Sequence, residues 1–217
     1  MANVNVAFGL RPLSKLGANY NSTGTTEYRI ASDNSNRIYQ GSPVIPLAAG
    51  VIDIVGAAAG GSVAYLGVFY GCEYVSASTG EVIFSNQWKG SSADADSNHP
   101  VKAFVYDDPN QLFVIAGDAG GSSFDTESEI RAGIFSNAPM ANGNAGNNTT
   151  GISTAVLDTS GIAVTATLGL RIIGIQDDPD NSDFTVAGIP FIVRINAHFN
   201  ANASRFDSQT TSLSTGI

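Results

Sequence analysis

The sequence predicts an all-β fold, a jelly-roll-like sandwich or barrel with long loops. Several segments alternate apolar and polar residues with a period of two, and clusters of Gly, Asn, Asp and Pro separate them. Only one short stretch has a helical pattern. The 217 residues are 43% hydrophobic, which suffices for a packed core. Charged residues make up 13%, about half of the ~25% that is typical of soluble domains.

Residues 62–76 form the stretch around which we expect the other strands to pair. A strand explains this stretch better than a helix, because a helix would scatter its apolar residues and contain two interior glycines. Gly67 and Gly71 lie four residues apart, which in a long strand indicates coiling, a bulge or a corner. The face opposite these glycines is apolar or aromatic throughout and consists of Ala64, Leu66, Val68, Tyr70, Cys72 and Tyr74.

The remaining elements follow from alternation and turn signals along the chain. Pro43 and Pro46 confine the strand over 37–47 to a sheet edge or split it. Asp107-Asp108-Pro109-Asn110 is a turn signal, so residues 101–116 resemble a hairpin. We expect a short helix over 125–135 and two loops, over 85–100 and 139–151, with Trp88 as an anchor of the first loop. The other expected strands span 27–31, 51–55, 81–84, 153–158, 168–177 and 189–196.

The domain organisation that we expect is a central β domain with two appendages. Residues 1–26 form an extended N-terminal arm, residues 27–206 form the β-sandwich or barrel, and residues 207–217 form a flexible tail. The arm contains large apolar side chains beside a proline, so we expect it to be buried against another chain. The alternative is that this segment is an edge strand of the same domain.

Charge and cysteine content exclude several classes of function. A net charge of −9 and a pI of about 4.4 disfavour binding to nucleic acids and to anionic membranes. The single cysteine, Cys72, precludes an internal disulfide, and we interpret it as a small buried hydrophobe. With no signal peptide and no apolar span, we expect a soluble protein that is synthesised in the cytoplasm.

The search for catalytic and metal-binding motifs predicts a protein that is not an enzyme and needs no cofactor or metal. No nucleotide-binding glycine loop or nucleophile elbow is present. Cys72, His99 and His198 are too far apart in sequence to form an evident catalytic pair. The calcium-like loop that begins at Asp94 fails at its sixth and twelfth positions, and Pro179 interrupts a second acidic cluster at 177–183.

Six stretches spread over residues 8–198 stand in an order that carries a family resemblance. Each stretch alone has little specificity, whereas their shared order is more informative. The stretches are FGLRP at 8–12, YQGSPV at 39–44, YLGVFYG at 65–71, VYDDP at 105–109, LRIIG at 170–174 and VRINAH at 193–198.

This order resembles the capsid decoration, or cement, proteins of tailed bacteriophages. The resemblance implies a β-rich, often jelly-roll-like protein on the outer surface of the virion capsid, where it clamps neighbouring major capsid subunits. It implies the major capsid protein and further copies of itself, as a homotrimer or homodimer, as partners, and no catalytic residue. If it holds, the capsid-binding arm is the segment Phe8, Gly9, Leu10, Arg11 and Pro12.

The sequence admits three other interpretations. The first is a different virion component, such as a tail-tube, baseplate or fibre-associated protein, which copy number per particle would distinguish. The second is a hydrolase on a β scaffold, which the absence of a catalytic constellation makes the least favoured. The third is a carbohydrate-binding β-sandwich, which needs an exposed aromatic platform or a calcium loop. Trp88 is the aromatic candidate for such a platform.

Overall fold

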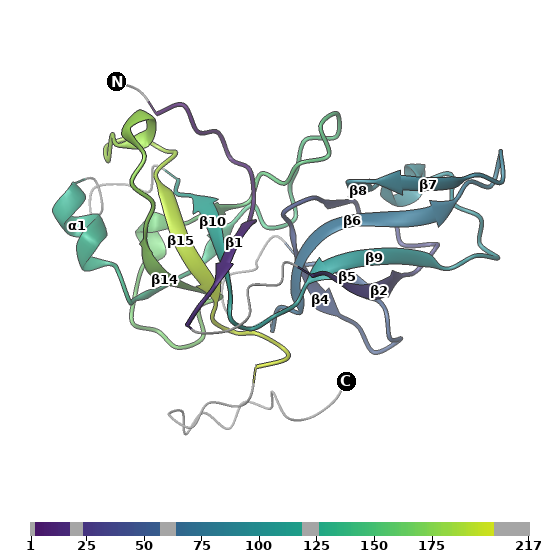
Figure 1. The fold of residues 1–217 in the computed structure, drawn as a ribbon, viewed down its shortest axis with the longest axis horizontal. Helices are drawn as coiled ribbons and strands as arrows, with labels where there is room; N and C mark the ends of the chain where they lie inside the picture. The colour runs from purple at the N-terminus through teal and green to yellow at the C-terminus, as the bar shows by residue number, and fades with distance from the viewer. Residues whose placement is uncertain (1–2, 18–23, 57–63, 119–125, 202–217) are drawn as a thin grey trace.

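The computed structural model describes residues 3–17, 24–56, 64–118 and 126–201, and it confirms the all-β prediction. The described residues form fifteen strands in antiparallel sheets, with one short α-helix and three single 3-10 turns. Two larger sheets lie at opposite ends of an elongated molecule (Figure 1). No helix within these ranges is long and apolar enough to cross a lipid bilayer.

The first sheet has the strand order β1-β10-β15-β14-β11. Its inner face packs on the small ladder β12–β13 and on the helix α1, which begins with a capping box between Thr126 and Glu129 and buries Ile130. The elements are β1 (Arg11–Lys15), β10 (Gln111–Ala116), β15 (Pro190–Ile195), β14 (Leu170–Ile175), β11 (Asn137–Ala138), β12 (Met140–Ala141), β13 (Val156–Leu157) and α1 (Glu127–Ala132), with 3-10 turns η2 (Thr159–Gly161) and η3 (Pro179–Asn181).

The second sheet has the order β2-β9-β6-β4-β5, with β7 paired to β6. A separate hydrophobic core lies under it, and the fully buried Trp88 and Phe69 are among its largest side chains. Its elements are β2 (Thr26–Ile30), β9 (Val101–Tyr106), β6 (Gly67–Val75), β4 (Pro43–Pro46), β5 (Ile52–Ile54) and β7 (Val82–Ser85), and the short pair β3 (Ile38–Tyr39) and β8 (Gln87–Trp88) and the turn η1 (Gly90–Ser92) accompany it.

The predicted central strand is confirmed as β6, the middle strand of the second sheet. The bulge that its glycines predicted is present, because the register with β9 shifts between Phe69 and Gly71. A Cβ on Gly67 would lie 2.2 Å from the carbonyl oxygen of Tyr106, so only glycine fits this close strand pair. The prediction for Tyr70 was wrong: its side chain is 48% exposed, because the bulge turns it away from the apolar face.

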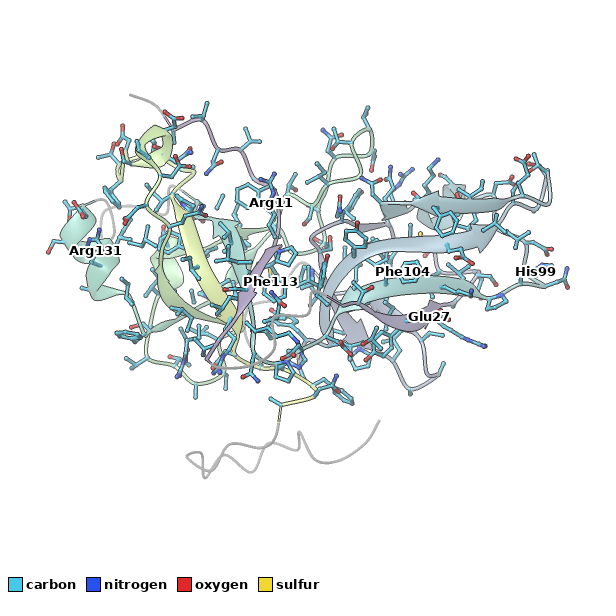
Figure 2. The ribbon with its side chains drawn as sticks, viewed as in Figure 1. Arg11, Glu27, His99, Phe104, Phe113 and Arg131 are labelled. Carbon is cyan, nitrogen blue, oxygen red and sulfur yellow. The ribbon has the colours of Figure 1, made fainter. Side chains whose placement is uncertain are left out.

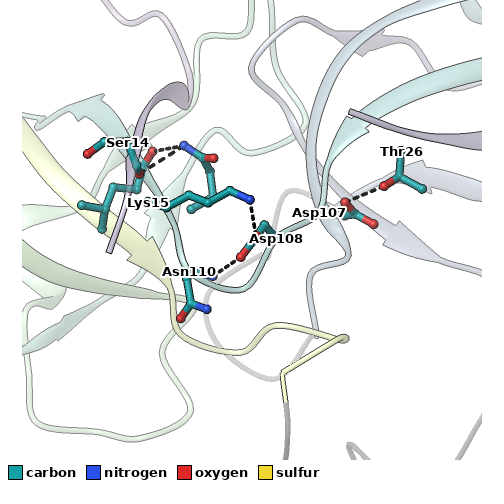
Figure 3. A network of polar contacts seen from close by, with 8 residues as sticks. Ser14, Lys15, Thr26, Asp107, Asp108 and Asn110 are labelled. Carbon is teal, nitrogen blue, oxygen red and sulfur yellow. Dashed lines mark hydrogen bonds and ion pairs between the residues drawn. The ribbon is translucent and has the colours of Figure 1, made fainter. Parts of the chain in front are cut away.

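The predicted hairpin over 101–116 was wrong, since β9 belongs to the second sheet and β10 to the first. The turn between them is a crossover that hydrogen bonds fasten to both sheets (Figure 3). Asp107 accepts hydrogen bonds from Thr26 Oγ1 and from Tyr28 Oη on β2, at 2.8 and 2.7 Å. Asp108 lies 2.5 Å from Lys15 Nζ on β1. The two aspartates therefore fix the relative position of the sheets.

The structure also corrects the prediction that residues 1–26 are an arm separate from the β domain. Residues 11–15 form β1, the edge strand of the first sheet, and pair with β10. Phe8 and Leu10 are buried inside this same chain, at 5% and 1% exposure. These side chains pack against apolar residues that lie about 100 positions further along the chain, and a local sequence pattern does not reveal such distant contacts. The alternative of a local edge strand is thus correct for this segment.

The other strand and helix predictions hold with narrower or shifted bounds, and the strand over 37–47 is split into β3 and β4, as its prolines predicted. The predicted loops over 85–100 and 139–151 are corrected, because each contains a two-residue strand, β8 and β12, that is too short to show an alternating pattern. The fully buried Trp88 lies on β8 and anchors the first of these segments. The described residues form two large hydrophobic cores and a third small cluster of Phe8, Val114 and Ala116, and Leu10 belongs to the first large core. The predicted tail over 207–217 lies outside the described residues. The segments with confirmed strands or helix are 27–31, 51–55, 81–84, 125–135, 153–158, 168–177 and 189–196.

Candidate binding groove between the two sheets

A groove of about 400 Å³ lies where β1 of the first sheet meets β6 and β9 of the second. Figure 2 places Arg11 at this junction between the two sheets. Most of the side chains that line the groove are aliphatic or aromatic, so it offers an apolar concavity at the protein surface. The lining residues are Phe8, Leu10, Arg11, Pro12, Gln40, Gly41, Val68, Phe69, Tyr70, Tyr106 and Ile152.

Backbone hydrogen bonds hold the N-terminal wall of the groove against the second sheet. Leu10 N donates to the carbonyl oxygen of Gly41 at 2.9 Å, and Gly41 N donates to that of Phe69 at 2.8 Å. Gly9 has φ +70, and a Cβ there would lie 2.6 Å from the carbonyl oxygen of Gly41. Glycine is therefore required for the chain to turn and approach this closely. These hydrogen bonds and this close approach attach the wall to the second sheet.

Two aromatic contacts shape the interior of the groove. The Arg11 guanidinium lies 4.0 Å from the centre of the Phe8 ring, a cation–π contact. Tyr70 and Tyr106 meet edge to face, with ring centres 5.6 Å apart. Burial, with a smaller contribution from Tyr70, raises the pKa of Tyr106, so its hydroxyl stays protonated at neutral pH. The groove can hold an apolar or aromatic side chain of a partner, with one positive charge at its wall.

Four of the five predicted site residues line this groove, namely Phe8, Leu10, Arg11 and Pro12. Gly9 is the turn between them. Sequence reasoning missed the opposite wall, which comes from β6, β9 and the segment before β4. A signal existed, because the stretches 39–44, 65–71 and 105–109 contain Gln40, Gly41, Val68, Phe69, Tyr70 and Tyr106.

The structure does not bring Cys72, His99 and His198 together, since each has different partners. Cys72 is buried, its Sγ donates to the carbonyl oxygen of Gln87, and burial raises the thiol pKa to about 12, which confirms the prediction of a buried hydrophobe. His99 lies at the far tip of the second sheet, 2.9 Å from Asp96 (Figure 2). Burial lowers the pKa of His198 to about 4, so this imidazole is neutral at pH 7.

In each of the two acidic segments, at least one carboxylate is used in local hydrogen bonds. Asp94 Oδ2 accepts from the hydroxyls of Ser76 and Ser78, and Asp178 caps the turn η3. Among the described residues, no three His, Cys, Asp or Glu side chains form a group that could hold a metal ion. Trp88 is fully buried, so it does not form the exposed aromatic platform that carbohydrate binding would need.

Comparison of the chain with protein-family models, with curated proteins and with solved structures gives no match.

Proposed function

We propose that this protein is a structural component of a tailed-phage virion that binds the outer surface of the capsid and holds neighbouring major capsid subunits together. The observation that carries the proposal is the convergence on one groove of four stretches, 8–12, 39–44, 65–71 and 105–109. These four account for most of the resemblance to decoration proteins. In the folded chain they become a single surface feature.

The properties of the groove suit docking onto a protein surface. Tyr70 is 48% exposed at the groove, and Val4 and Val6, on the segment that leads into it, are 70% and 77% exposed. Exposed apolar side chains beside an apolar concavity are typical of protein–protein contacts. We therefore place the capsid contact on the groove and this adjoining segment, with a loop or side chain of the major capsid protein inserted in the groove.

The physical consequence of such binding is stabilisation of the shell by mass action. A protein that binds the assembled lattice, and not separated subunits, adds its binding free energy to the stability of the lattice. Many symmetric copies make the sum large even when each contact is modest.

The proposal is tested by co-sedimentation of the purified protein with undecorated heads. Tyr70→Ser and Arg11→Glu change side chains that line the groove, and we expect each to weaken binding at least tenfold. Arg29→Glu, an exposed change on β2, is the matched control and should bind like the wild type. Equal binding by all four proteins would contradict the groove as the contact. Decorated and undecorated heads with the same DNA that rupture at the same temperature would contradict the cementing role.

Copy number per particle separates this proposal from a tail-tube, baseplate or fibre component. A capsid decoration protein is present in hundreds of copies, and a tail-tip component in far fewer. A glycan array tests the carbohydrate-binding alternative with the same purified protein.

A further inference from the structure

Two arginines lie side by side on the outer face of the first sheet. Arg171 on β14 and Arg194 on β15 are directly paired in the antiparallel register, so their side chains project on the same side. Their neighbours Ile172 and Val193 are buried in the core on the opposite face. Both arginine side chains are partly buried. We call Arg171 and Arg194 the arginine pair.

The charge of the arginine pair has no counter-charge within the part of the chain that the structure describes. None of the ion pairs formed there involves either residue. Like charges that stand directly opposite each other destabilise a sheet. Burial, and then the charge of Arg171, lowers the pKa of Arg194, but a guanidinium group stays protonated at neutral pH. The arginine pair is therefore a concentrated positive charge.

A short chain of hydrogen bonds holds Arg171 in position. Its Nε donates to Asn137 Oδ1 at 3.1 Å, and Asn137 Nδ2 donates to the carbonyl oxygen of Thr165 at 2.9 Å. Asn137 is 2% exposed and pairs with Arg171 across β11 and β14. With Nε in use, the terminal amino groups of Arg171 are the donors that remain. They bond no other residue among those that the structure describes.

Arg194 leaves its donors unused as well. Its Nε is buried and has no hydrogen-bond partner, and its terminal amino groups make no hydrogen bond to the described part of the chain. Leu112 on β10, which pairs with Arg194 on the other side, is 8% exposed, and Ile192 is partly buried. Apolar neighbours exclude water and strengthen a hydrogen bond to a charged ligand. The terminal amino groups of both arginines can thus act together on one ligand.

We propose that the arginine pair is a binding site for one small oxyanion, a phosphate or a carboxylate, which lies between the two guanidinium groups. Guanidinium groups bind carboxylate and phosphate oxygens through parallel N–H···O bonds, and two adjacent arginines offer two such forks. The ligand would neutralise the repulsion between the arginines. A nucleic acid suits the site less well, because a net charge of −9 repels a long phosphate backbone.

The oxyanion can be a free ion or the side chain of an Asp or Glu on a protein that docks on this face. Arg11, at the wall of the groove, pairs with Val114 on β10. Val114 faces Ile192 on β15, two residues before Arg194. Two strand spacings and two residues correspond to roughly 12 Å, so a protein in the groove can also reach the arginine pair. The inference goes beyond the proposed function and does not rest on it.

Free ions are tested with the full-length protein at constant ionic strength. Sodium phosphate and sodium acetate are titrated against chloride while heteronuclear NMR follows the amide signals of β14 and β15 and the arginine Nε–H signals. We expect saturable shifts around the arginine pair, with a dissociation constant for phosphate of about 1 mM or lower. Arg171→Gln and Arg194→Gln should each weaken binding at least tenfold. The matched control Arg29→Gln, an exposed change on β2, should bind like the wild type.

Melting curves give a second measurement that needs no assigned spectrum. Phosphate stabilises many proteins because it is excluded from their surface, so the informative quantity is the difference between wild type and variant. With phosphate at ten times a dissociation constant of about 1 mM, the wild type should gain at least about 3 °C more than either glutamine variant. The variant Arg171→Lys/Arg194→Lys keeps both charges without the planar forks, so its gain should lie between them.

Co-sedimentation with undecorated heads distinguishes the two sources of the oxyanion. A carboxylate on the partner is indicated if Arg171→Gln and Arg194→Gln weaken head binding at least tenfold and Arg29→Gln does not. The proposal is overturned if neither free ion gives saturable shifts and neither arginine variant reduces head binding, or if the shifts are the same in the variants. Tyr70→Ser, which tests the groove, should leave the phosphate titration unchanged, so failure of one proposal is separable from failure of the other.

Discussion

Replacement of Leu10 by alanine tests whether the N-terminal segment is part of the β domain. Leu10 is 1% exposed and packs in the core of the first sheet, while its backbone N–H bonds Gly41. Large-to-small changes of this kind at buried leucines cost about 2–5 kcal/mol, from lost burial and the cavity that remains. For a chain of this size, about 3 kcal/mol corresponds to a fall in melting temperature of roughly 6–12 °C.

Leu13→Ala on the same segment is the matched control, because Leu13 is 42% exposed. Its substitution should change the free energy of unfolding by no more than about 0.5 kcal/mol. Urea unfolding and thermal melting of both variants, followed by circular dichroism, give the comparison. If Leu10→Ala unfolds with the wild-type midpoint, the segment is not packed as described and the interpretation of 1–26 as a separate arm returns. For the same reason, deletion of residues 1–13 should destabilise the first sheet and is not a clean test of capsid binding.

Three further predictions concern single sites. Gly67→Ala should destabilise the protein by about 1–3 kcal/mol, because the added Cβ would clash with the facing strand. Gly56→Ala is the control and should not destabilise it, because a Cβ there meets nothing within 4 Å. Denaturant titration compares the two variants. Burial alone raises the pKa of Asp108, but hydrogen bonds from Lys15 and a backbone N–H leave it below its usual value. The ionised Asp108 carboxylate therefore stabilises the fold above about pH 4, and this stabilisation is lost on acidification. The free energies of unfolding of the wild type and of Asp108→Asn should differ at about pH 7 and converge near pH 2. Cys72 should resist a thiol reagent in the native protein and react at once in denaturant, given its pKa of about 12.

Local alternation predicted the strands well, because a strand with one buried face has apolar and polar residues in alternation along the sequence. Along β9, Val101, Ala103 and Val105 are buried while the residues between them are not, as the period of two requires. The glycines of β6 predicted its bulge for a similar local reason. Tyr70 was assigned to the wrong face because the bulge adds a residue and interrupts the alternation at that point.

Pairing between distant strands could not be predicted in the same way. The turn signal at residues 107–110 marks a change of direction, and it does not say whether the next strand returns to the same sheet. The bonds from Asp107 and Asp108 to β2 and β1 direct β10 into the first sheet instead. The groove has the same origin: residues 8–12 were selected from the sequence, but the tyrosines opposite them belong to strands far along the chain.

The N-terminal segment gives binding and stability a common structural basis. Phe8 and Leu10 complete the protein core, and with Arg11 and Pro12 they form one wall of the groove. A partner seated in the groove binds the molecule only when this segment is in place. At a partner concentration of 100 times the dissociation constant, it would therefore stabilise the docked segment by about 2.7 kcal/mol. If the proposed contact with a capsid is correct, docking and the edge strand stabilise each other, so the protein should be most resistant to unfolding when it is bound.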